Sequence, residues 1–403
     1  MKLKALAVLL TVVVSLSLIV GCEQSTSPVD NAAEQSIDLP EAGTLIEGSY
    51  IVVLKDRTSL LKSTPVGSAA AQMQQKAVDV LERNKIRRNS IDRVYSRVLA
   101  GFSAKISAEE AAKLSKDDKI AYVEQDMVIT RGPGNGGGGG GPTPPEPPAE
   151  VIPWGITRVG GAVNYTGNNV AWVIDTGVDY DNADLNVDIS RSVNFIDPAS
   201  TADDDNGHGT HVAGTIAAID NDINVVGVAA GATVVGVKVL ARNGSGSTTG
   251  VIAGIDYVAA NGSPGDVANM SLSGGISEAL DAAVLAASNN GIYFSLAAGN
   301  ESSDANYSSP ARVNGPYVYT VSASDINDDW AYFSNYGNPP VDYCAPGYGV
   351  ISLAPGGSNA SMSGTSMSAP HVAGILLSTG GNISADGTVN GDPDGYPDPI
   401  AHR

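Results

Sequence analysis

Three segments of the sequence carry the side chains that acyl transfer by a serine requires. Asp175 directly follows the apolar run 170–174, so its carboxylate should lie at the carboxyl end of a strand. His211 lies in a segment rich in small residues, and Ser366 lies in the segment 363–374, where a loop enters a predicted helix. A serine nucleophile needs an imidazole to accept its proton and a carboxylate to hold that imidazole. Together the three residues predict a catalytic triad, although Asp175 alone would more often be a turn former or a helix cap, and Ser366 alone a helix cap.

The same chemistry needs hydrogen-bond donors for the oxyanion that forms on the attacked carbonyl. The backbone N–H of Ser366 at a helix start is one candidate, and the side-chain amide of Asn300 is the other. A second histidine, His208, precedes His211 by three residues, and one of the two could be purely structural. The pair lacks an HExxH pattern, so a catalytic zinc is not expected.

From Trp154 onward, short apolar runs alternate with helical patterns, which predicts the elements that position these side chains. Such elements are most simply joined as right-handed crossovers in a parallel sheet, giving an α/β domain with helices on both faces. Ligands of these sheets gather at the carboxyl ends of the strands, where the candidate residues fall. The predicted strands are 170–174, 233–240, 266–272, 291–298 and 317–322, and the predicted helices are 208–219, 248–260, 277–290 and 365–378.

Residues 49–131 predict a second, smaller unit. Their pattern of strand, helix, two strands, helix and strand is typical of a ferredoxin-like α+β domain. The segment 132–150 contains six consecutive glycines and then a proline-rich stretch. It therefore predicts a linker before a catalytic domain at 151–403.

The N-terminus has the layout of an export signal. An apolar run, 5–20, is followed by a polar flank without a Lys/Arg cluster, so we expect a secretory signal over 1–22 rather than a stable membrane span. Residues 19–22 resemble a bacterial lipoprotein box, which implies a lipid anchor on Cys22, and an ordinary cleaved signal is the alternative. A polar tether, 23–48, follows. Both interpretations predict a secreted or cell-surface protein.

The 403 residues carry a formal net charge of −20, and −19 of it falls on residues 151–403. This balance argues against nucleic acid as a partner, because no basic surface exists to displace counterions from phosphates. Only two cysteines occur, so a disulfide-stapled scaffold is excluded.

The Asp, His and Ser segments resemble the three boxes of the subtilisin-like serine peptidases, in the style of the proteinase K-like branch. The order Asp, His, Ser is the one known for subtilisin itself. The resemblance covers about 154–380 and implies the subtilisin-like parallel-sheet fold. By residue-for-residue match it implies Asp175 as the orienting acid, His211 as the general base, Ser366 as the nucleophile and Asn300 as an oxyanion donor.

The unit 49–131 resembles the propeptides of this family, most clearly at 101–105 and 121–126. The resemblance implies a zymogen whose own propeptide assists folding and then blocks the cleft with its last strand. The bond to be cut should lie between Ile129 and Asn135, and the sequence does not fix it.

Two further segments match those with which the family sandwiches an extended substrate. Main-chain hydrogen bonds to exposed strand edges would supply affinity there, and side-chain pockets would supply specificity, although both segments could be merely flexible loops. The family usually has glycine where Ser273 stands, so its hydroxymethyl group should narrow or polarise the primary pocket. The matching residues are Gly244, Ser245, Gly246, Ser271, Leu272 and Ser273.

Calcium is the expected metal, because it favours carboxylates and backbone carbonyls in loops. Pro316, Val318 and Asp342 match calcium-binding positions of proteinase K-like enzymes, the first two through backbone oxygens. An ordinary loop and strand end is the alternative. No organic cofactor is expected.

Three other functions fit part of the pattern. An esterase of the α/β-hydrolase type would place its serine in a Gly-x-Ser-x-Gly elbow ahead of Asp and His, whereas Ser366 comes last. A thiol protease would need an imidazole for Cys344, which we expect to be buried and inert. A non-catalytic surface module would have lost a triad residue, and all three are present. We therefore expect a monomeric, secreted serine endopeptidase that acts on polypeptides through an acyl-enzyme.

Overall fold

The computed structural model describes residues 41–56, 66–132 and 147–403. The predicted signal with Cys22, most of the tether and most of the linker lie outside these residues. Among the helices of the described ranges, none is long and apolar enough to cross a membrane.

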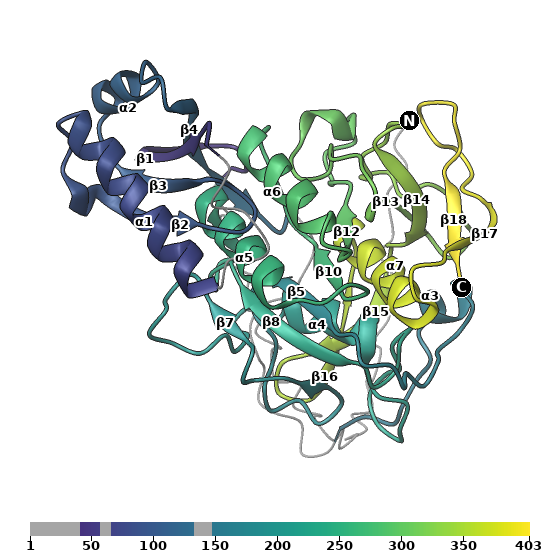
Figure 1. The fold of residues 1–403 in the computed structure, drawn as a ribbon. Helices are drawn as coiled ribbons and strands as arrows, with labels where there is room; N and C mark the ends of the chain where they lie inside the picture. Colours follow the sequence, from purple (N-terminus) through teal and green to yellow (C-terminus); the bar gives the residue numbers. More distant parts are fainter. Residues whose placement is uncertain (1–40, 57–65, 133–146) are drawn as a thin grey trace, which may run out of the picture. The chain divides into compact units, whose positions relative to one another are not determined.

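The N-terminal unit has the predicted βαββαβ order (Figure 1). Its strands form an antiparallel sheet in the order β4, β1, β3, β2. Ser107 begins α2 with a capping box, because its hydroxyl accepts the N–H of Glu110 while the Glu110 carboxylate accepts the N–H of Ser107. One face of the sheet packs on the helices through residues such as Phe102, Met73 and Leu114. The elements are β1 (Leu45–Leu54), α1 (Val66–Arg83), a 3-10 turn (Arg88–Ser90), β2 (Ile91–Tyr95), β3 (Gly101–Lys105), α2 (Ala108–Leu114) and β4 (Ile120–Thr130).

The C-terminal unit is built on a large sheet with the strand order β17, β18, β14, β13, β12, β10, β5, β8, β6, and β7 also pairs with β8. Every named pairing in it is parallel except that of β17 with β18. The predicted strands appear as β5 (Ala171–Asp175), β8 (Thr233–Lys238), β10 (Val267–Met270), β12 (Tyr293–Ala297) and β13 (Val318–Ser324). The predicted helices appear as α4 (His208–Ala217), α5 (Thr248–Asn261), α6 (Glu278–Ser288) and α7 (Thr365–Thr379).

Strand β5 explains why helices lie on both faces of this sheet. Successive side chains of a strand point to opposite faces, and all of those on β5 are apolar up to Ile174. Ala171 and Val173 join the core that α4 and α7 cover, whereas Trp172 and Ile174 join the core that α5 and α6 cover. The predicted α/β fold is confirmed.

Several elements were not expected from the sequence. They include a hairpin of β15 and β16, whose first strand packs on α4, and a C-terminal pair of strands that extends the sheet. These elements are α3 (Trp154–Arg158), β6 (Asn186–Val187), β7 (Val193–Asn194), β9 (Ser245–Ser247), β11 (Ser273–Gly274), a 3-10 turn (Ala305–Tyr307), β14 (Val341–Pro346), β15 (Val350–Ala354), β16 (Ser358–Met362), β17 (Ser384–Thr388) and β18 (Pro399–His402).

Candidate active site

Asp175 and His208 form the polar centre of the site. Asp175 is the last residue of β5 and is completely buried, and its carboxylate accepts the N–H of Thr176 at 2.7 Å. Nδ1 of His208 lies 2.8 Å from Oδ1 and 3.0 Å from Oδ2 of Asp175. A carboxylate only accepts hydrogen bonds, so Nδ1 carries the proton and Nε2 is left as the acceptor. That is the tautomer a general base needs.

A glycine turn at the start of α4 positions His208 beside Asp175. Gly207 precedes the helix with φ of +105°, in the left-handed region that favours glycine, and His208 is the first helical residue. The imidazole therefore lies at the start of α4, beside the carboxyl end of β5.

The prediction that His211 pairs with Asp175 is wrong. His211 is one turn further along α4, and its Nε2 donates to the carbonyl oxygens of Val350 and Ala360 at 3.1 and 3.2 Å. Burial lowers the pKa of His211 to about 3, so its ring is neutral and joins α4 to the β15–β16 hairpin. The same motif holds both histidines three residues apart, and the sequence alone did not distinguish their directions.

Ser366 and Asn300 lie at the same place as His208. The three side chains line one small cavity, which Arg131 also lines. Ser366 is the second residue of α7, so its backbone N–H belongs to the first turn, where helical N–H groups lack partners within the helix. Oδ1 of Asn300 accepts the N–H of Thr365 at 2.8 Å, which fixes the amide and turns Nδ2 away from Thr365.

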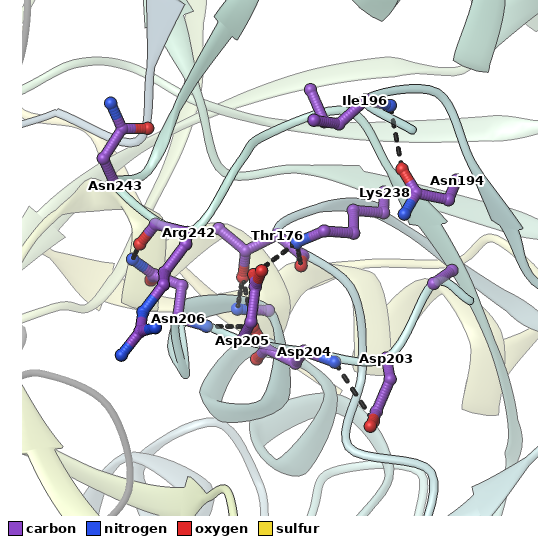
Figure 2. A network of polar contacts seen from close by, with 12 residues as sticks. Thr176, Asn194, Ile196, Asp203, Asp204, Asp205, Asn206, Lys238, Arg242 and Asn243 are labelled. Atoms are coloured by element: carbon purple, nitrogen blue, oxygen red, sulfur yellow. Dashed lines mark hydrogen bonds and ion pairs between the residues drawn. The ribbon is translucent and has the colours of Figure 1, made fainter. Parts of the chain in front are cut away.

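A network of polar contacts fixes the loop that carries His208 (Figure 2). Oδ1 of the buried Asp204 accepts the hydroxyl of Thr176 and the N–H groups of Asn206 and Gly207. Its Oδ2 accepts the N–H and the hydroxyl of Thr210 at 2.9 and 2.6 Å. Asp204 therefore ties the residue after Asp175 to the residues on both sides of His208.

Lys238 supports the same region from β8. Figure 2 shows its ammonium between the carbonyl oxygen of Thr176 and the carboxylate of Asp205, which is 2.6 Å away. The Lys238 side chain is 4% exposed, whereas that of Asp205 is 51% exposed. A buried ammonium needs such acceptors, so Lys238 holds the two loops together at the carboxyl edge of the sheet.

The two predicted substrate segments flank the last strand of the N-terminal unit. Ile129 pairs with Gly246 on one side and with Gly274 on the other, and Thr130 pairs with Ser245 and Ser273. All four pairings are antiparallel.

The remaining residues of these segments lie close by. The N–H of Arg131 donates to the carbonyl oxygen of Gly244 at 3.1 Å. The Ser271 hydroxyl donates to the carbonyl of Ser366 at 2.8 Å, and Leu272 is buried in the core. These segments therefore form strand edges in the described residues, rather than free loops.

Three carboxylates join the two units away from this cleft. Asp126 on β4 accepts the N–H and hydroxyl of Thr249 in the first turn of α5, and Glu124 accepts the N–H of Ala279 in the first turn of α6. In the opposite direction, Asp256 on α5 accepts three successive backbone N–H groups, those of 96–98. Carboxylates at helix N-termini are favourable, so the contacts of Asp126 and Glu124 position β4 over the site.

The predicted calcium ligands lie on neighbouring strands. Val318 begins β13, Asp342 lies on the adjacent β14, and Pro316 precedes β13. Burial raises the pKa of Asp342 to about 6, and its Oδ2 accepts the N–H of Thr320. Within the described ranges, no group of three or more His, Cys, Asp or Glu side chains could hold a metal. A site here would therefore depend on backbone oxygens.

Cys344 is completely buried in β14, and burial raises the pKa of its thiol to about 12. A thiol in that state is not a nucleophile at neutral pH. The expectation of a buried, inert cysteine is confirmed.

Comparison with known proteins places both units in families. Residues 167–379 match the model of the subtilase family, and residues 49–131 match that of peptidase inhibitor I9. The chain is 36% identical over 377 residues to the extracellular serine proteinase of Thermus sp. (strain Rt41A), covering 89% of this chain and 86% of that one. It is 38% identical over 340 residues to alkaline serine exoprotease A of Vibrio alginolyticus, covering 82% of this chain but only 60% of that protein.

A solved structure gives the same result. The crystal structure of a cold adapted subtilisin-like serine proteinase matches with a TM-score of 0.54 at 37% identity and covers 62% of this chain and 97% of that chain. The predicted resemblance to the subtilisin-like peptidases is thereby confirmed. The chain belongs to the subtilase family of subtilisin-like serine proteases.

Proposed function

We propose that the chain is a secreted serine endopeptidase made as a zymogen, with Asp175, His208 and Ser366 as its triad. The observation that carries the proposal is the cavity that His208 and Ser366 share, beside a peptide strand held on both edges. Subtilase membership supports the reaction class, and the inhibitor-type unit supports the zymogen.

The first half of the reaction forms an acyl-enzyme. Oγ of Ser366 attacks the carbonyl carbon of the peptide bond while Nε2 of His208 takes its proton. Asp175 holds the ring and stabilises the imidazolium. The oxyanion accepts hydrogen bonds from the Ser366 N–H and from Nδ2 of Asn300, which Thr365 orients. His208 then gives the proton to the departing amine.

The second half releases the product. A water molecule gives a proton to His208 and attacks the ester carbonyl carbon, and the same donors stabilise the second oxyanion. The proton returns to Ser366 as the carboxylic product leaves, which restores the enzyme.

Polypeptide substrates bind as an added strand. The edges formed by 244–246 and 271–273 already hold β4 in this way, so a substrate makes the same main-chain bonds once β4 has left. Ser273 contributes a hydroxymethyl group where the family usually has none.

The propeptide acts as an intramolecular inhibitor and chaperone. Its last strand fills the substrate edges, and its carboxylates cap α5 and α6, so it presents a surface on which both helices are held in place. A single catalytic chain suffices for this function, and we propose a monomer.

Export rests on the sequence and on the relatives. The apolar N-terminal run and the extracellular proteinase of Thermus support secretion. A lipid on Cys22 rests only on the lipoprotein-like residues 19–22 and would hold the propeptide rather than the processed catalytic domain.

A structural calcium ion fits Pro316, Val318 and Asp342. Asp342 is a half-buried carboxylate with a main-chain donor, and burial of an anion is costly unless a cation balances it. The ion would join two strands of the sheet and has no part in the chemical step.

The test is expression of the full chain beside its Ser366→Ala variant in a host without other proteases. We expect the wild type to shorten by its N-terminal part and the variant to stay full length. Identical processing of both would overturn the proposal.

A further inference from the structure

We propose that Asn335 is a positioning residue that aims the side-chain amide of Asn300 at the oxyanion. This inference rests on the proposed function, in which Nδ2 of Asn300 is an oxyanion donor, and it adds the residue that holds the main chain of that donor. Asn335 is completely buried and lies in the connection between β13 and β14. It is distant from Asn300 in sequence, so only the fold brings the two residues together.

Asn300 needs such support because it lies beyond the sheet. The last pair of β12 with β13 is Ala297 with Val321, and Gly299 then turns the chain with φ of +108°, in the left-handed region that favours glycine. Thr365 holds Oδ1 of the Asn300 side chain through its N–H and its hydroxyl, at 2.8 and 3.1 Å. The direction of Nδ2 therefore depends also on where the main chain of Asn300 is held.

The Asn335 side chain holds the main chain on both sides of Asn300. Its Oδ1 accepts the N–H groups of Glu301 and Ser303, both at 3.0 Å. Its Nδ2 donates to the carbonyl oxygen of Ala298 at 3.0 Å and to Oε2 of Glu301 at 2.7 Å. An asparagine amide offers two acceptor lone pairs and two donor hydrogens, so these four bonds use its whole capacity. An ionised aspartate has the same shape but cannot make the two donor bonds.

Glu301 and Gly299 bring Asn335 close to Asn300 itself. Oε2 of Glu301 accepts the N–H of Asn300 at 2.9 Å as well as Nδ2 of Asn335, so one carboxylate oxygen joins the two residues. A Cβ atom on Gly299 would lie 2.2 Å from Nδ2 of Asn335, so only glycine leaves room for the amide there. The N–H of Asn335 also donates to the carbonyl oxygen of Gly299 at 3.0 Å. Asn335 thus contacts the residues directly before and after Asn300.

The sheet in turn holds Asn335. The hydroxyl of Ser334 accepts the N–H of Ala323 on β13 and donates to the carbonyl oxygen of Asn335, both at 3.0 Å. The N–H of Ala331 donates to the carbonyl oxygen of Ala323 at 2.9 Å, and Ser334 is completely buried. A strand of the sheet therefore fixes the amide that fixes the oxyanion donor, which is the kind of support that precise sites need.

Loss of this support should affect the chemical step and not substrate binding. The oxyanion forms in the transition state and is absent from the bound substrate, so a displaced Asn300 amide lowers kcat and leaves KM nearly unchanged. A displacement of about 1 Å can cost a factor of about 10² in rate. A residue that only stabilised the fold would change the amount of active enzyme and leave the kcat of each active site as it is.

The test is a double-mutant cycle in the processed enzyme, with active sites counted by titration with a covalent serine probe. Asn335→Asp puts a carboxylate oxygen against the carbonyl of Ala298 and the carboxylate of Glu301. We expect its kcat to fall about 10- to 100-fold, with KM within about twofold of the wild type. Asn300→Ala should lose about 10²- to 10³-fold, as known for the side-chain donor of subtilisin. Adding Asn335→Asp to Asn300→Ala should cost less than about threefold more, because the donor that Asn335 positions is already gone.

Asn169→Asp is the matched control. Nδ2 of Asn169 also donates to a carbonyl oxygen and to a carboxylate, those of Pro264 and Asp266. Asn169 comes just before β5, at the opposite end of this strand from Asp175. The same change of amide to carboxylate should therefore leave kcat within about twofold of the wild type.

Two results would overturn this inference and leave the proposed function standing. One is a double variant in which the losses of Asn300→Ala and Asn335→Asp multiply in full. The other is a kcat for Asn335→Asp that equals that of Asn169→Asp. An unchanged kcat in Asn300→Ala would instead contradict the proposed oxyanion role of that residue.

A second variant decides the question if Asn335→Asp yields no active sites that the probe labels. The side chain of Glu301 is exposed, so Glu301→Ala should fold, yet it removes the oxygen that joins Asn335 to the N–H of Asn300. Its kcat should fall about 3- to 10-fold in the wild-type background and stay within about twofold in the Asn300→Ala background. An equal fall in both backgrounds would overturn the inference.

Discussion

Nδ1 of His208 lies 2.8 Å from Oδ1 of Asp175, whereas Nε2 of His211, one helical turn away, donates to two backbone carbonyls of a hairpin. The two imidazoles of one motif thus have opposite surroundings. One contacts a buried carboxylate beside the serine, and the other is a neutral structural donor with its pKa lowered to about 3 by burial.

Substitution of the two histidines should separate these roles. His208→Ala should lower kcat by at least about 10³-fold, because the proton acceptor is lost. His211→Gln keeps an N–H donor and should retain kcat within about threefold, while its free energy of unfolding falls by about 1 to 3 kcal/mol. Peptide hydrolysis by the processed enzyme and urea unfolding measure the two effects. A larger loss of kcat in His211→Gln than in His208→Ala would reverse the assignment.

Asp204 should act as a positioning residue. In Asp204→Asn one acceptor oxygen becomes an NH₂ group facing the donors of Thr210 or Thr176. We expect kcat to fall roughly 10- to 100-fold, which is about 1.4 to 2.8 kcal/mol, with KM nearly unchanged and a shifted acidic limb of the pH profile. Asp205→Asn, at the more exposed neighbour, should change kcat far less. Equal effects of the two variants, or a change confined to KM, would argue against positioning.

Asp256 should control how long the cut propeptide stays bound. Its carboxylate accepts three backbone N–H groups of the propeptide, so Asp256→Ala should weaken inhibition about 10- to 100-fold and make activity appear sooner after the cut. The activity of the fully released enzyme should not change. Asp220→Ala, at an exposed carboxylate, serves as the matched control. If the delay between the cut and the appearance of activity is unchanged in Asp256→Ala, this contact does not control the release of the propeptide.

Asp398 should make stability depend on pH. Burial raises the pKa of Asp398 to about 7. The hydrogen bond from the Ser322 hydroxyl lowers this pKa, and the negative charges of Asp392, Asp394 and Asp342 raise it. The folded protein therefore keeps a proton that the unfolded chain has already lost, so this contribution is present below about pH 4 and is lost as the pH rises through 7.

In the inactive Ser366→Ala background, the Tm should fall by roughly a few degrees between pH 5 and pH 8. Asp398→Asn, which can still accept the Ser322 hydroxyl, should flatten this dependence. A Tm that falls equally in both proteins would show that other groups cause it.

Calcium removal should destabilise the catalytic unit. Chelation should lower the Tm of the Ser366→Ala protein, and excess calcium, but not magnesium, should restore it, because calcium accepts irregular sets of carboxylate and backbone oxygens, whereas magnesium demands near-ideal octahedral geometry. Asp342→Asn should lose most of this response. A Tm that is insensitive to the chelator would exclude a structural ion.

The sequence predicted the fold well because its signals are local. The apolar runs of β5 and β8 and the helical periodicity of α4 and α7 can be recognised without tertiary contacts. The same is true of Asp175 at the end of β5 and of Ser366 at the start of α7. The short strands β9 and β11 were predicted as substrate edges only through the family resemblance, since three and two residues carry no periodic signal of their own.

The choice between His208 and His211 depends on which direction each ring points from α4, and neighbours distant in sequence decide that. A glycine immediately before His208 is the one local signal, because it marks the helix start beside the sheet edge. Asp204 and Arg131 were missed for the same reason: their partners are brought together by the fold.

Labelling with a fluorophosphonate probe tests the central claim most directly. The processed enzyme should gain one covalent adduct on Ser366, located by peptide mass spectrometry. The His208→Ala variant should lose that adduct, and the His211→Gln variant should keep it. An unlabelled Ser366 in the processed wild type, or labelling that depends on His211 and not on His208, would contradict the triad of Asp175, His208 and Ser366.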